Sequence, residues 1–70
     1  MEQSSEISLR VGRRIARLRK RQGLTLEKLA YENDIPKSTL SRIERGLVDA
    51  RISNLARIAA GLAVPLRKLF

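Results

Sequence analysis

The chain has 70 residues, 43% of them hydrophobic and 31% charged, which is an ordinary mixture for one small globular domain. It contains no cysteine and no histidine, which excludes disulfides and removes the usual ligands of zinc, the commonest general base and the thiol nucleophile. We therefore predict that the protein is not an enzyme and that it uses no metal, cofactor or small-molecule ligand.

Basic charge is concentrated in one segment of the chain. Lysine and arginine number 15 against 7 acidic residues, which gives a net charge of +8. Residues 10–21 hold seven bases and no acid, so the rest of the chain contributes only +1. Such density favours a polyanionic partner, nucleic acid or an anionic membrane surface, over a solvated face without a partner.

Membrane insertion and secretion are not indicated. No apolar run approaches the ~20 residues of a membrane span, and the first six residues are polar and acidic, unlike a secretory signal. The basic segment is amphipathic, but its narrow apolar stripe lacks Trp and Phe and is needed for the core. We therefore predict a cytoplasmic, nucleoid-associated protein.

Glycine and proline divide the chain into five short helical patterns, which predicts an all-α, compact five-helix bundle. It is expected to occupy residues 8–70, behind a flexible N-terminal arm of residues 1–7. The first helix, about 8–22, buries Val11 and Ile15 and ends at Gly23. Arg19 lies at the edge of that buried stripe, where it needs an anionic partner.

The centre of the chain, about residues 26–45, predicts two helices joined by a short break. Thr25 is the expected N-cap of the first, and Pro36 is expected in the first turn of the second, about 36–45. A fourth helix is expected over about 52–62, and a last short turn follows Pro65.

The outward face of the 36–45 helix carries small polar and cationic side chains, as a helix entering the ~12 Å major groove of DNA requires. Arg42 can bridge guanine O6 and N7, and Ser38 and Ser41 can donate or accept at several base edges. Thr39 and Arg45 lie nearer the flanks, where phosphates would be. On these residues alone, an ordinary solvated helix face carries equal weight.

Three stretches carry a family resemblance: VGRRIARLRKRQGLTLEKLA (11–30), KSTLSRIERG (37–46) and LARIAAGLAVPLRKLF (55–70). In this order and spacing they resemble the Cro and phage-repressor type, or Xre, helix-turn-helix domains. The resemblance covers most of the chain. It implies a five-helix bundle that binds operator DNA, usually as a dimer, and regulates transcription, and we expect a repressor.

The resemblance also implies residue roles. The base-reading positions of the family fall on Lys37, Ser38, Ser41 and Arg42. Its phosphate-contacting positions fall on Thr25, Thr39 and Arg45, to which we add Arg51 and Arg14. Its structural ion pair falls on Arg19 and Glu44.

The chain departs from the family pattern at several positions. Leu26 replaces a glutamine that reaches phosphate or braces the recognition helix, and Asp49 would weaken a phosphate contact in the next loop. Asp34 replaces the turn glycine, in a break where Asn or Asp tolerates a left-handed conformation. Ala63 replaces a left-handed glycine, so we expect strain there.

A second copy is expected because one recognition helix reads too few base pairs to select a site. The C-terminal apolar residues are too many for so small a core to cover: Val64, Leu66, Leu69 and Phe70. They predict a homodimer through residues 62–70, formed on DNA if its interface is small. Two-fold symmetry then requires a palindromic operator with half-sites ~34 Å apart.

Two other functions stay open. The same fold serves as a protein-interaction or antitoxin-like module, which would bind its partner without the steep salt dependence of DNA binding. The chain could also be the DNA-binding part of a longer sensor-regulator.

Overall fold

A computed structural model describes residues 5–70, and every regular element in that range is helical. The elements are α1 (Glu6–Arg21), α2 (Leu26–Glu32), α3 (Lys37–Glu44), α4 (Ile52–Leu62) and one 3-10 turn, η1 (Leu66–Leu69). The all-α prediction is confirmed, but the expected fifth helix is only this turn. Its four residues close through a hydrogen bond from Lys68 N to the Pro65 carbonyl at 2.9 Å.

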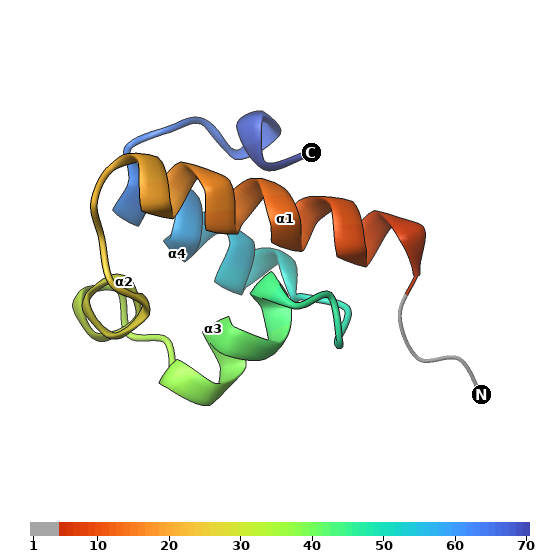
Figure 1. Cartoon of the computed structure of the whole chain (residues 1–70), viewed down its shortest axis with the longest axis horizontal. Helices are drawn as coiled ribbons and strands as arrows, with labels where there is room; N and C mark the ends of the chain where they lie inside the picture. The colour runs from red at the N-terminus through yellow and green to blue at the C-terminus, as the bar shows by residue number, and fades with distance from the viewer. Residues whose placement is uncertain (1–4) are drawn as a thin grey trace.

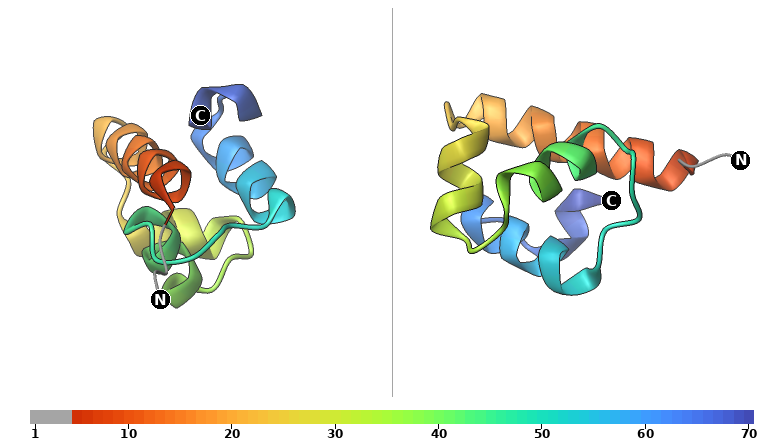
Figure 2. Two further views of the ribbon diagram at one scale, coloured as in Figure 1. Left: turned by 90° about the vertical axis from the view of Figure 1, so that its right-hand side faces the viewer. Right: turned by 90° about the horizontal axis from the view of Figure 1, so that it is seen from below.

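The helices enclose one core. The longest, α1, crosses the molecule with α3 on one side and η1 on the other (Figure 1). Seen end-on, α1 and α4 form two walls, α2 and α3 form the base, and η1 closes the opposite side (Figure 2). The core takes side chains from every element, and the most deeply buried are Ile15, Leu29, Leu40, Ile58, Leu62 and Leu69.

Leu69 belongs to this core and has no exposed surface. The expectation that it stays uncovered for a partner chain is therefore wrong, because η1 folds back against α1 and α4 and places Leu69 inside. Its neighbours Leu66 and Phe70 remain 37% and 49% exposed, and Val64 is half-buried.

Helix α1 begins earlier than the sequence suggests. Ser5 is its N-cap, and the Ser5 hydroxyl accepts a hydrogen bond from Ser8 N at 3.0 Å. Glu6 and Ile7, assigned above to the flexible arm, therefore form the first turn of the helix, where the Glu6 charge suits the helix dipole. The rest of the predicted arm, residues 1–4, lies outside the described range.

The turns follow the departures noted in the sequence. Asp34 and Ala63 both adopt the left-handed conformation, with φ of 56° and 58°. Ala63 caps α4, and its N–H donates to the Ala60 carbonyl at 3.1 Å. Pro36 is the N-cap of α3, one position before the first turn in which we expected it, and it supplies no side-chain cap.

Candidate nucleic-acid interface

Helix α3 lies unusually close to α1. A side-chain carbon at Gly12 would lie 2.7 Å from the Glu44 carbonyl oxygen and still closer to that of Ile43, so only glycine fits here. Arg19, two turns further along α1, reaches Glu44 at the end of α3. The sequence thus fixes α3 against α1 at two points, and the exposed face of α3 acquires a defined orientation.

The expected pair of Arg19 and Glu44 is present and bidentate. Arg19 Nε lies 2.7 Å from Glu44 Oε2, and Nη2 donates to Oε1 at 2.9 Å. The remaining nitrogen, Nη1, donates to the Leu24 carbonyl at 2.8 Å. Both side chains are nearly buried, with 12% and 8% exposed. The hydrogen bond to Glu44 raises the pKa of Arg19 above its usual value, against the opposing effect of burial.

The predicted base-reading residues share one face of α3. At ~100° per residue, Lys37, Ser41, Arg45, Ser38 and Arg42 fall within an arc of about 140°. Leu40 and Ile43, on the opposite side, are buried in the core. Lys37, Ser38 and Arg42 are exposed and Ser41 is half-buried. This face therefore presents only small hydroxyls and flexible cations.

Four of the five predicted phosphate contacts lie at the ends or at the side of that face. Thr25 caps α2, with its hydroxyl accepting from Lys28 N at 3.0 Å, and Arg45 caps the other end of α3. Thr39 and Arg51 line a hollow of about 360 Å³ between α3 and the start of α4. Asn54, a polar residue of the amphipathic α4, also lines this hollow.

Arg14 does not join this surface. Helical spacing puts it about 160° from Gly12, which faces α3. Its Nη2 donates to the carbonyl of Phe70 at 3.2 Å. Because η1 and α3 lie on opposite sides of α1 (Figure 1), the structure places Arg14 beside the C-terminal turn and away from the other predicted phosphate contacts.

One contact at the site has no signal in the sequence. Lys37 Nζ, at the start of α3, lies 2.8 Å from Glu27 Oε2 in the first turn of α2. The hydrogen bond from Lys37 lowers the pKa of Glu27 below its usual value. The two residues meet only because of the angle between α2 and α3, which residue spacing does not reveal.

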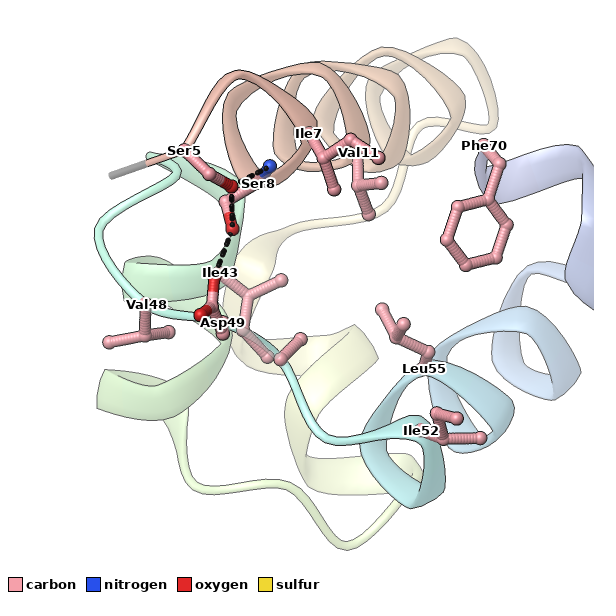
Figure 3. A pocket seen from close by; sticks show the side chains of 11 residues that line it. Ser5, Ile7, Ser8, Val11, Ile43, Val48, Asp49, Ile52, Leu55 and Phe70 are labelled. Atoms are coloured by element: carbon pink, nitrogen blue, oxygen red, sulfur yellow. Dashed lines mark hydrogen bonds between the residues drawn. The ribbon is translucent and has the colours of Figure 1, made fainter. Parts of the chain in front are cut away.

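An apolar groove of about 470 Å³ opens between α1, α4 and the C-terminus (Figure 3). Ile7 and Val11 line it from α1, Ile52 and Leu55 from α4, and Phe70 from the C-terminus. Hydrogen bonds from Ser5 to Ser8 at 3.0 Å and from Ser8 to Asp49 at 2.6 Å border one end. Asp49, expected to oppose a phosphate, is thus tied to α1.

Residues 5–70 offer no group of three or more acidic side chains that could hold a metal ion. Among the same residues, no helix is long and apolar enough to cross a bilayer.

Comparison with known proteins decides the family. The helix-turn-helix family model, HTH_3, matches residues 15–69. The chain belongs to this family. It is 41% identical over 61 residues to the HTH-type transcriptional regulator SlrR of Bacillus subtilis, which covers 86% of this chain and 40% of SlrR. The chain thus spans well under half of that relative.

Two further relatives match over nearly their whole length. The control protein C.MunI of a Mycoplasma species is 34% identical over 67 residues, 94% of this chain and 90% of C.MunI. The solved restriction-modification controller C.Esp1396I, a tetramer in complex with its natural 35 base-pair operator, superposes with a TM-score of 0.82 at 27% identity. That match covers 93% of this chain and 96% of the controller. The predicted family of DNA-binding helix-turn-helix regulators is confirmed.

Proposed function

We propose that this chain binds double-stranded DNA in a sequence-specific manner and regulates transcription, as a repressor. The observation that carries the proposal is the exposed face of α3, which holds hydroxyls and cations only and is anchored from behind by Gly12 and Arg19. The small hydroxyls leave such a face free to enter the major groove without steric obstruction. It acts by binding alone, without a cofactor, on the nucleoid in the cytoplasm.

Base contacts are proposed for the exposed face of α3, and phosphate contacts for its rim, meaning the residues at the ends and side of that face. In this proposal, base edges are read by Lys37, Ser38, Ser41 and Arg42. Phosphates are held by Thr25, Thr39, Arg45 and Arg51. The rim contacts supply affinity for any duplex, while the face supplies the preference for one sequence.

The regulator is proposed to act as a homodimer on a palindromic operator. Phe70 and Leu66 supply the exposed apolar surface at the C-terminal turn, half-buried Val64 lies next to them in the chain, and Leu69 supports them from the core. The neighbouring apolar groove adds Ile7 and Ile52, which are 58% and 72% exposed. A two-fold contact here would bury side chains that otherwise remain in water.

Selection of duplexes from a fragmented bacterial genome by the purified chain, at two salt concentrations, tests this function. We expect enrichment of a palindromic sequence and an affinity that falls steeply as salt rises. Binding to an acidic protein with no salt-dependent retention of duplex DNA would instead identify a protein-interaction module.

A further inference from the structure

The ion pair between Glu27 and Lys37 lies within the proposed DNA surface. Lys37 is the first residue of α3, and its side chain is 60% exposed; that of Glu27 is 63% exposed. Of the cations on this face, only Lys37 has a carboxylate partner among residues 5–70. The other two ion pairs in that range join Arg19 to Glu44 and Lys28 to Glu32. Arg42 and Arg45 have no such partner among these residues.

A carboxylate at this place has two effects on DNA binding. It holds the Lys37 ammonium at 2.8 Å, so a base or phosphate oxygen has to displace it or share the cation. It also puts a negative charge beside the N-cap Thr25, where a phosphate is proposed to lie, and like charges repel.

We propose that Glu27 is an internal competitor of DNA for Lys37, and that it raises sequence specificity by withholding this cation from non-cognate duplexes. On a duplex without a suitable base acceptor, Lys37 stays paired and adds little to affinity. On the operator, a guanine edge offers two acceptors and offsets the lost pair. The inference rests on the proposed role of Lys37 as a base-reading residue.

Glu27→Gln tests the competition, with Glu32→Gln as its matched control. Glu32 lies on the same helix and is 54% exposed, and it pairs with Lys28 at 3.2 Å instead of Lys37. Both substitutions remove one negative charge. The probes are a random-sequence 30 base-pair duplex, a size of ~30 base pairs being enough for two half-sites, and the duplex that the unmodified chain enriches from a random pool. Binding is followed by fluorescence anisotropy over a salt series.

We expect Glu27→Gln to tighten binding to the random duplex by about two- to fivefold, the range that one exposed ion pair allows. The selected duplex should gain less, so the specificity ratio falls. The slope of log affinity against log salt concentration should steepen by up to about one unit. In the unmodified chain, DNA displaces the Glu27 carboxylate, which then takes up a cation from solution, and glutamine does not do so. Glu32→Gln should change both affinities equally and leave the ratio unaltered.

Adding Lys37→Ala separates competition from simple charge. In that background, Glu27→Gln should behave as Glu32→Gln does. A fall in the specificity ratio that survives without Lys37, or one that Glu32→Gln reproduces, would overturn the inference. A selective loss on the selected duplex would show instead that Glu27 orients Lys37. If the unmodified chain shows no salt-dependent duplex binding, the proposed function itself fails. Thermal melts confirm that each variant is folded.

Discussion

Arg42, in the last turn of α3, and Arg45, the C-cap of that helix, are proposed to make different kinds of DNA contact. Arg42→Ala should remove a bidentate base contact, which costs about 1–3 kcal/mol and relaxes the preference at one base position. Arg45→Ala should weaken binding to every duplex and lower the salt slope by about one unit. Competition binding against single-base operator variants distinguishes them. A uniform loss in both variants, with base preference unchanged, would contradict this division.

The pair of Arg19 and Glu44 is almost buried, so it should matter more for stability than for DNA contact. Glu44→Ala leaves the guanidinium with only the Leu24 carbonyl and should cost about 3 kcal/mol. Arg19→Met keeps an apolar stem in place of the charge. In the double variant the loss should be smaller than the sum of the single losses. Strictly additive losses in thermal melts would mean that the two residues do not interact.

Ala63 adopts a left-handed backbone conformation, with φ of 58°, which destabilises the folded state because its Cβ is crowded there. Ala63→Gly should raise the free energy of unfolding by about 0.5–1 kcal/mol, because glycine adopts this conformation without the Cβ clash. Ala60→Gly, an exposed position in the body of α4, should instead lower it by about 1 kcal/mol. Denaturant unfolding of both variants checks the prediction, and a similar loss in each would refute the strain at Ala63.

At the scale of elements, the close approach of α1 and α3 sets the position of the recognition helix. Gly12→Ala should push the carbonyl groups of Ile43 and Glu44 away and destabilise the fold by about 2 kcal/mol. It should also weaken operator binding, because α3 moves relative to Thr25 and Arg51. Melting temperature and operator affinity provide the two measurements.

Gly23→Ala is the control for this element. Gly23 has a φ of 72° and open space around it, so the added methyl strains the backbone without touching α3. We expect a cost of about 1 kcal/mol in stability and an unchanged operator affinity for the folded protein. If both variants changed operator affinity equally, the close contact at Gly12 would not be what sets the position of α3.

For the whole molecule, the C-terminal turn is the proposed dimer contact. Phe70→Glu should abolish cooperative binding to a palindromic duplex and leave weak half-site binding, because it places charge in an apolar interface. Tyr31→Glu, at an 86% exposed position on α2, is the control and should retain cooperativity. Analytical ultracentrifugation with footprinting reports both. An unmodified chain that stays monomeric on DNA and protects one half-site would contradict the dimer.

Local chemistry in the sequence was enough for much of the fold. The 3.6-residue spacing of apolar side chains predicted the four α-helices, and Gly23 and the Asn33-Asp34 break predicted two left-handed turns. The left-handed turn at Ala63 was expected from the family resemblance. The helical spacing that places Arg19 at the edge of the buried stripe predicted that it needs an anionic partner, and the family resemblance identified Glu44 as that partner. These features depend on neighbours within a turn or two, so the order of residues already contains them.

The contacts that the sequence did not predict depend on the angles at which the helices cross. Only the tertiary structure placed Leu69 in the core, Arg14 beside Phe70, and Glu27 against Lys37. Each of these contacts joins elements whose relative angle follows from the packing of the whole core, and no local pattern specifies that angle. The sequence therefore determined the four α-helices, the Thr25 cap and the chemistry of the α3 face, while the packing decided which side chains remain exposed and which charges already have partners.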